Sequence, residues 1–265
     1  MVKAATATYA YCVVANATRP RPKRKVARLP GMGPVRLLDV DRGLYLAVAD
    51  APLDRYGEAA INRGLGDLDW VSRAAIAHEA VVESFIGEAA VLPMKLFTIF
   101  TSDERALTHV RGERQRILAV SKRVANQHEW GVRVILDRAR AVRARTPKGA
   151  AGRSTSASAL PSGIAYLTRK KAQRDANAEL AEHARETVAA LFDRLAARSS
   201  AAKRKAGGEL PVQTGPLLLD AAFLVPRSRA KSFQSLMARE AKSLGRHGYG
   251  VTLTGPWPPY SFVQD

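Results

Sequence analysis

Paired histidine and glutamate residues are the first feature of this sequence that could do chemistry. His78-Glu79 opens the segment HEAVVE, which shares two letters with the HExxH pattern that holds zinc on one face of a helix. Val82 stands where that pattern needs its second histidine, so the ligand set of a zinc site is incomplete. We therefore expect no metal here and place His78 at the border of the apolar face of a helix.

Other candidates for catalysis are equally incomplete. His128-Glu129 lies just before an expected strand, where a hydrogen-bonded structural role is favoured over acid–base work. Gly31-Met32-Gly33 gives only part of a phosphate-binding loop and precedes a strand instead of a helix. The serine-rich segment 154–158 lacks the GxSxG pattern of a nucleophile elbow. The sequence predicts no enzyme, no catalytic residue and no cofactor; histidines that cluster only in space would reopen the question.

Cys12 is the only cysteine among 265 residues, and it lies in a stretch typical of a buried strand. A single cysteine forms neither an internal disulfide nor a zinc cluster, so Cys12 is interpreted as a core residue. No apolar run reaches the roughly 18 residues of a membrane-spanning helix, and the first residues do not resemble a secretory signal. We expect a cytoplasmic protein.

The net charge of +18 invites a nucleic-acid interpretation. Sixteen of the positive charges lie in three segments rich in small residues and proline, at 16–28, 138–153 and 198–205, and the remainder of the chain is close to neutral. These segments hold no aromatic residue that could stack on a base. Solubility or attraction to an acidic surface is favoured, and non-specific nucleic-acid binding through the basic connectors stays open as the alternative function.

Periodicity predicts an α+β fold in the first half of the chain. Residues 8–14 are typical of a strand, and a hairpin follows with its turn at Gly43. The next expected elements are a helix over 70–86, a central strand over 91–100, a helix from a Thr101 cap to about 126 and a strand over 129–137. This order predicts an N-terminal domain over 1–137, a ferredoxin-like variant of the two-layer α/β sandwich.

A basic linker over 138–160 is expected to precede a smaller C-terminal α+β domain over 161–265. The expected elements are a long helix from Gly163 to about Ala197, a strand over 216–225, a helix capped by Ser228 and a strand over 249–254. Two strands make a poor sheet, so one pairing partner is not identified. The domain ends in TGPWPPYSFVQD, which we interpret as an ordered tail because aromatic residues alternate with its prolines.

Several short motifs, taken in order, resemble the gas vesicle protein F/L family of accessory proteins (GvpF/GvpL). They are TYAYCVV, the helix with Trp70, His78 and Glu79, then VLPMKLFTIF, HEWGVRVIL, GIAYLTRKK, AAFLV and VTLTGPWPPYSFV. The last motif is the most specific, and the series covers residues 8–263. In one departure, Leu96-Phe97 stands where the family has a Phe-Gly pair after the basic residue of the LP motif. The basic segments at 16–28 and 138–153 are also longer than the family requires.

The resemblance implies a cytoplasmic, gas vesicle-associated protein of two α+β domains that takes part in building these hollow, gas-filled protein shells. It implies contact with the small hydrophobic shell protein and with other accessory proteins, without catalytic residues, a cofactor or a membrane.

Candidate residues for partner contact, or for a seal between the domains, are Leu96, Phe97, Tyr166, Arg169, Trp257, Tyr260 and Phe262. The apolar side of the long helix is a further candidate surface. For the tail, two interpretations stay open. Trp257 and Tyr260 either seal the domains, which is favoured, or anchor the shell protein from an exposed position.

Overall fold

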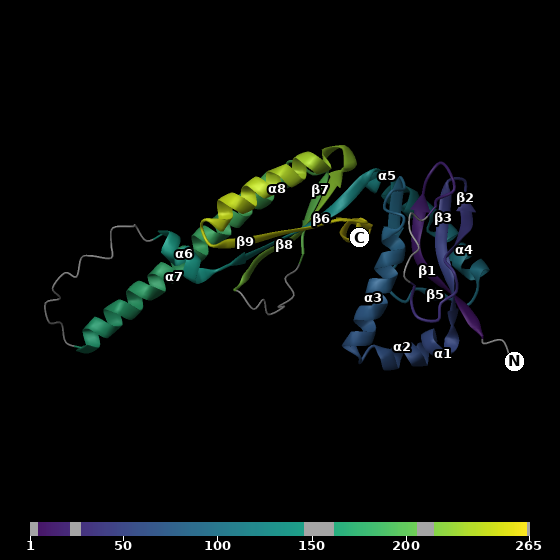
Figure 1. Ribbon diagram of the computed structural model, residues 1–265, viewed down its shortest axis with the longest axis horizontal. Coiled ribbons are helices and arrows are strands. Elements are labelled where there is room, and N and C mark those ends of the chain that lie inside the picture. The colour runs from purple at the N-terminus through teal and green to yellow at the C-terminus, as the bar shows by residue number, and fades with distance from the viewer. Residues whose placement is uncertain (1–4, 22–27, 146–161, 206–214, 264–265) are drawn as a thin grey trace. The chain divides into compact units, whose positions relative to one another are not determined.

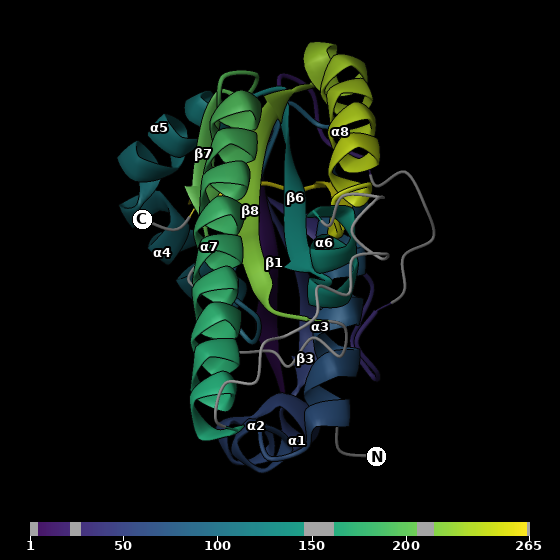
Figure 2. The same cartoon turned by 90° about the vertical axis from the view of Figure 1, so that its left-hand side faces the viewer.

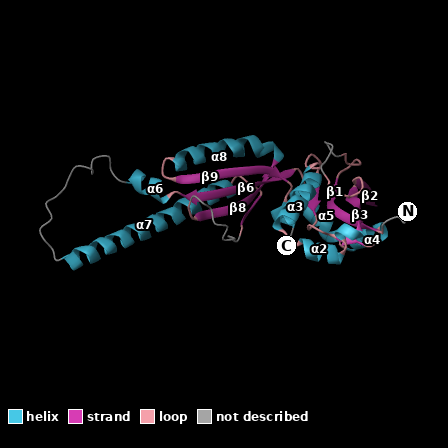
Figure 3. Cartoon of the chain, turned by 60° about the horizontal axis from the view of Figure 1, so that its bottom comes forward, coloured by secondary structure: helices cyan, strands magenta, loops and turns pink. Residues whose placement is uncertain are grey.

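The structure is a computed structural model that describes residues 5–21, 28–145, 162–205 and 215–263. The chain folds into two compact units (Figure 1). Unit 1 comprises Met1–Glu129 and Pro256–Asp265, and unit 2 comprises Trp130–Gly255. Each unit contains one sheet with helices packed on it (Figure 3). The predicted α+β class is confirmed. The tail, which we had grouped with the second domain, belongs to unit 1.

Five strands form the sheet of unit 1: β1 (Thr6–Ala15), β2 (Arg36–Asp41), β3 (Leu44–Pro52), β4 (Ala90–Pro93) and β5 (Ile99–Phe100). β1 is central and pairs antiparallel with β3 on one side and with β4 and β5 on the other, while β2 pairs with β3. In the hairpin of β2 and β3, Gly43 has a positive φ of 74°. The predicted glycine turn is therefore confirmed.

Helices lie on both faces of this sheet. They are α1 (Leu53–Tyr56), α2 (Glu58–Gly64), α3 (Leu68–Glu83), α4 (Asp103–Gly112), α5 (Arg114–Val124) and, in the tail, α9 (Tyr260–Val263). α3 buries Ala74, Val81 and its neighbours in one core with Tyr9 and Tyr11 of β1. α4 and α5 lie against the opposite face, which is why β1 is buried along both sides.

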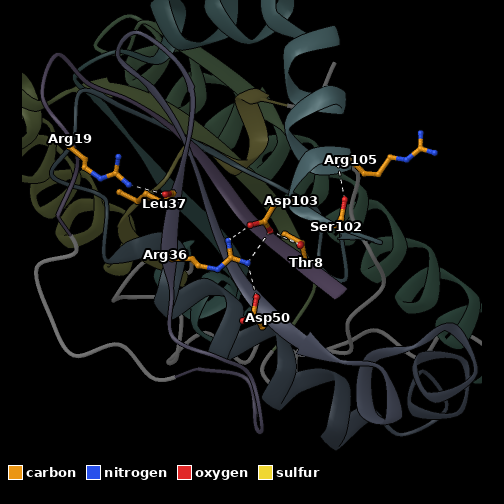
Figure 4. Close-up of polar contacts among 8 residues, drawn as sticks. All are labelled: Thr8, Arg19, Arg36, Leu37, Asp50, Ser102, Asp103 and Arg105. Atoms are coloured by element: carbon orange, nitrogen blue, oxygen red, sulfur yellow. Dashed lines mark hydrogen bonds and ion pairs between the residues drawn. The ribbon is translucent and has the colours of Figure 1, made fainter. Parts of the chain in front are cut away.

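A charged cluster fixes the start of α4 on the sheet (Figure 4). The Arg36 guanidinium of β2 donates to both carboxylate oxygens of Asp103, at 2.6 and 2.9 Å, and to Asp50 of β3 at 2.6 Å. Thr8 of β1 donates its hydroxyl to Asp103 at 2.7 Å. The hydrogen bond from Arg36 lowers the pKa of Asp103, so the carboxylate stays charged and ties the helix start to three strands.

Two predicted elements of unit 1 differ from the structure. The helix expected from Thr101 to about 126 is two helices, and its N-cap is Ser102, whose hydroxyl accepts from the Arg105 N–H at 3.3 Å. The strand expected over 91–100 is interrupted between β4 and β5. The apolar run hid this interruption because good strand formers, Val91 on one side and Phe97, Thr98, Ile99 and Phe100 on the other, flank Pro93 and Lys95.

Four strands form the sheet of unit 2: β6 (Gln127–Leu136), β7 (Ala201–Arg204), β8 (Leu217–Pro226) and β9 (Tyr249–Trp257), in the order β7-β8-β6-β9. The helices are α6 (Arg138–Arg145), α7 (Ser162–Ala196) and α8 (Ala230–Gly245). This connectivity, with β6 between β8 and β9, is the split βαβ arrangement of ferredoxin-like folds.

Two strand assignments are corrected by this sheet. β6, which we expected in the first domain, pairs with β8 and β9 in unit 2. β7 lies in the segment 198–205 that we interpreted as a basic connector, and it pairs antiparallel with β8. β7 is the pairing partner that the sequence did not reveal, since its four residues AAKR carry no strand pattern.

The core of unit 2 lies between its sheet and α7 and α8, which cover one face (Figure 2). Alternate residues of β6, from Trp130 to Leu136, face the helices. The predicted apolar stripe of α7 is confirmed, and Leu180, Leu191 and Leu195 are buried there. The apolar side of the long helix is therefore occupied by the unit's own core, contrary to the expectation of a free partner surface.

Three smaller corrections concern local signals. Ser228 lies in a 3-10 turn over Arg227–Arg229, and α8 begins only at Ala230. β9 continues through Pro256, which an edge strand tolerates because one side of its backbone needs no ladder partner. The expected linker begins as helix α6, while 146–160, and 22–27 of the first basic segment, lie outside the described residues. No described helix is long and apolar enough to cross a membrane.

Candidate partner-binding surface of unit 1

The loop between β4 and β5 holds a phenylalanine in a backbone conformation that favours glycine. Phe97 has a φ of 61°, which costs a residue with a Cβ roughly 1–2 kcal/mol. β1 fixes both ends of this loop. The Met94 N–H donates to the Tyr11 carbonyl, and the Ala10 N–H donates to the Thr98 carbonyl, both at 2.9 Å. The strain therefore lies between two anchored points.

Two contacts hold Phe97 in this conformation. Its ring stacks on Trp70 of α3, with 5.1 Å between the centroids and 16° between the planes. Its N–H donates to the Tyr9 hydroxyl at 3.2 Å. The Trp70 ring has room because residue 64 is glycine, and a Cβ there would lie 2.6 Å from it. The surroundings thus impose the conformation of Phe97.

A buried polar cluster lies beneath the loop. The Tyr9 hydroxyl is 2.8 Å from His78 Nδ1. Burial raises the pKa of Tyr9 and lowers the pKa of His78 to about 4, so near pH 7 the phenol is protonated and the imidazole is neutral. The hydroxyl consequently donates to Nδ1 while it accepts from Phe97. His78, which the sequence placed at the border of the apolar face of its helix, is buried on that helix.

The tail packs as part of unit 1. Phe262 is 3% exposed and Val263 is 8% exposed. Arg123 of α5 donates to the Phe262 carbonyl at 2.6 Å, and the buried Glu129 carboxylate accepts from both the N–H and the hydroxyl of Ser261, each at 2.7 Å. Glu129 therefore has the structural, hydrogen-bonded role that the sequence predicted.

The predicted contact residues fall into three groups. Leu96 and Phe97 are half-buried in the loop, and Tyr260 packs against the same core as Phe97. Phe262 is buried, while Trp257 at the end of β9 is 37% exposed. The third group, Tyr166 and Arg169, lies exposed on α7 in unit 2. Unit 1 thus brings together residues from the LP motif and the tail, and the GIAYLTRKK pair belongs to unit 2.

Sequence reasoning missed three residues that hold the loop: Tyr9, Trp70 and His78. All belong to the motifs that carried the family resemblance. The sequence carried no signal that the strand with Tyr9 and the helix with Trp70 and His78 meet the loop in space.

An open cavity of about 500 Å³ with a lining of mixed polarity lies beside Phe97. Leu53, Tyr56, Ile61 and Ile99 contribute to its lining. No group of three His, Cys, Asp or Glu side chains in the described part of the chain could hold a metal ion. Aromatic and aliphatic side chains gathered on a surface are typical of the core of a protein–protein interface.

The family model described as "Gas vesicle synthesis protein GvpL/GvpF" matches residues 7–264. The chain belongs to the GvpL/GvpF family. It is similar to gas vesicle protein L of Streptomyces sp. (strain CB03234), with 30% identity over 237 residues, 88% of this chain and 84% of that protein. It is also similar to gas vesicle protein F of that strain, with 25% identity over 261 residues, 97% of this chain and 99% of that protein.

Solved structures of GvpF share the fold of this GvpL/GvpF family member. The GvpF structure from Anabaena sp. PCC7120 matches with a TM-score of 0.67 and 15% identity, over 98% of this chain and 97% of that one. GvpF from Microcystis aeruginosa matches with a TM-score of 0.65 and 15% identity, over 98% and 99%. The resemblance inferred from the motifs is confirmed.

The conformation of Phe97 predicts that glycine, ordinarily a more destabilising replacement than alanine, is the better tolerated of the two at this position. Phe97→Gly and Phe97→Ala both lose the stack on Trp70, but only glycine adopts the positive φ without strain. We expect Phe97→Gly to be more stable than Phe97→Ala by about 1 kcal/mol. Urea unfolding of the two variants measures the difference. An alanine variant as stable as the glycine variant would show that the loop relaxes its conformation.

Proposed function

We propose that this chain is a non-catalytic accessory protein that binds the hydrophobic shell protein, and other accessory proteins, during nucleation or growth of the gas vesicle. The observation that carries the proposal is the strained, half-buried Phe97 beside an open cavity lined in part by aromatic and aliphatic side chains, in a member of a gas vesicle family. We place the protein in the cytoplasm, in association with the vesicle.

The physical need for such a protein is clear. A small, insoluble subunit aggregates unless its apolar surface is covered until it polymerises. Strained residues persist where the structure over-determines them, and they cluster at ligand clamps and switch regions. Phe97 has that character, and Leu96 lies next to it.

The tail supports this surface in two ways. Phe262 and Tyr260 pack in unit 1 and stabilise it. Trp257 keeps 37% of its surface exposed, and we assign it a contact with the partner because exposed aromatic residues dominate interface hot spots.

The test is co-expression with the gas vesicle shell protein, followed by affinity capture of this chain from the soluble fraction at low and at moderate salt. We expect the shell protein to be recovered at both salt concentrations, since an apolar contact is not screened. Phe97→Gly should reduce recovery at least about tenfold, as for a hot-spot aromatic residue, while the variant remains folded.

Two outcomes would contradict the proposal. Full recovery of the shell protein with folded Phe97→Gly would remove the loop from the contact. Failure to recover it with the wild type, with nucleic acid captured instead and lost as salt rises, would favour the basic connectors as the functional part.

A further inference from the structure

We infer that the N-terminal part of α7 is a docking site for an acidic amphipathic helix of a partner protein. The inference rests on the proposed function, since such a partner would be another component of the vesicle assembly. It concerns a different surface from the loop of unit 1.

This part of α7 extends beyond the core of its own unit (Figure 1). No side chain of residues 163–179 is buried, and core contact begins at Leu180. At 1.5 Å per residue the exposed part is about 25 Å long. Within the described residues it contributes nothing to the core of unit 2, so the packing of that core gives no reason for its apolar residues.

A stripe of side chains follows one face of the exposed helix: Ile164, Leu167, Lys171 and Arg174. The spacing of three, four and three residues puts them on one side. Ile164 is 53% exposed and Leu167 is 64% exposed. The apolar half of the stripe therefore presents two large aliphatic residues to solvent.

This stripe is not an extension of the stripe that packs in the core. Continuing the core positions backwards from Leu180 with the same spacing reaches Asn177, Gln173 and Lys170, and then Tyr166. At 100° per residue, that face is turned about a third of a turn from Ile164 and Leu167. The two aliphatic residues thus form a separate apolar face.

The positive charges on this part of α7 favour an acidic partner. Arg169, Lys170, Lys171 and Arg174 follow the aliphatic pair, and no acidic residue occurs on α7 before Asp175. A helix with aliphatic residues opposite Ile164 and Leu167, and carboxylates opposite Lys171 and Arg174 on the same face, is complementary in both respects.

Other occupants fit less well. A parallel second copy would bring Lys171 and Arg174 of both helices close together, and like charges repel. An antiparallel second copy would set these cations against Leu167 and Ile164 and would offer them no carboxylate. A nucleic-acid backbone would pair with the cations but would leave Ile164 and Leu167 without an apolar contact.

The direct test uses a labelled synthetic acidic peptide of about three heptads, with leucine on one face and glutamate elsewhere, and its counterpart with lysine for glutamate. Fluorescence anisotropy of the full chain should show binding of the acidic peptide only. Two double variants, Ile164→Ser with Leu167→Ser and Lys171→Glu with Arg174→Glu, should each weaken binding at least about tenfold. The control Lys231→Glu with Arg239→Glu makes the same charge change on exposed positions of α8 and should leave binding unchanged.

Three results would overturn the inference. The first is equal binding of the two peptides, or no binding of either. The second is a dimer of the wild type that the double serine variant does not form. The third is binding of duplex DNA that is tighter than binding of the acidic peptide and is unchanged by the serine substitutions. Capture of the shell protein separates this from the proposed function. If wild type captures the shell protein while the peptide result is negative, only the α7 inference fails; if wild type captures no shell protein, the proposed function fails.

Discussion

Replacing Phe262 with alanine is expected to destabilise unit 1 by about 3–4 kcal/mol, the usual cost of removing a buried aromatic side chain. Phe262 is 3% exposed, and the backbone around it is held by Arg123 and Glu129. The substitution leaves a cavity that the anchored tail cannot close by moving. The tail is therefore expected to be structural at this residue.

The buried thiol of Cys12 can report the loss of stability of unit 1. Cys12 is the only cysteine, and it is 0% exposed in β1 of unit 1. Its thiol reacts only when unit 1 opens, so its labelling rate under native conditions reports the free energy of opening. For Phe262→Ala we expect this rate to rise about a hundredfold or more, since each 1.4 kcal/mol is tenfold.

Trp257→Ala is the matched control. It removes another aromatic residue of the same tail, but one that is 37% exposed. Its effect on Cys12 labelling should stay below about tenfold. Equal labelling rates for the two variants would mean that Phe262 does not stabilise unit 1 as its burial indicates.

The second large effect concerns pH. Burial lowers the pKa of His78 to about 4, below the usual 6.5 of histidine. Between these values the unfolded chain binds a proton that the folded chain does not, so the free energy of unfolding falls as pH falls. From this residue we expect a loss of about 2 kcal/mol at pH 5 and about 3 kcal/mol at pH 4, and no further change above pH 7.

His78→Asn isolates this contribution, because an amide oxygen can still accept from the Tyr9 hydroxyl but does not titrate. Urea unfolding of both proteins at pH 7, 5 and 4, read by hydrogen exchange in the peptide of residues 6–15, gives the comparison. The stability difference between wild type and variant should shrink steadily as pH falls. A constant difference would show that His78 does not titrate between folded and unfolded states.

The sequence predicted those elements whose signals are local. The period of α3 and of the buried half of α7, and the glycine turn at Gly43, depend on neighbouring residues alone. β6 was placed in the wrong sheet because its pattern shows a strand but not its pairing partners. β7 was missed for the same reason: AAKR becomes a strand only through its ladder with β8.

For the candidate site, too, the sequence predicted local features and missed contacts between residues that are distant along the chain. The family resemblance singled out Leu96-Phe97 as a departure from glycine, yet the positive φ of Phe97 follows from Trp70 and Tyr9, which are distant in sequence. The buried role of Phe262 required knowledge of which surface the tail meets. The exposure of Tyr166 and Arg169 followed only from the structure, which shows that α7 first contacts the core of unit 2 at Leu180.

The return of the tail to unit 1 has a consequence for biosynthesis. Unit 1 is discontinuous in sequence, since Pro256–Asp265 follow the whole of unit 2. A ribosome therefore makes every residue of unit 2 before it makes Ser261, which Glu129 needs as a partner, and Phe262. Unit 1 therefore reaches full stability only after residues 256–263 have been made, although its five strands are made before most of unit 2. Nascent chains without residues 256–263 would hold a weakened unit 1 that chaperones and proteases can engage.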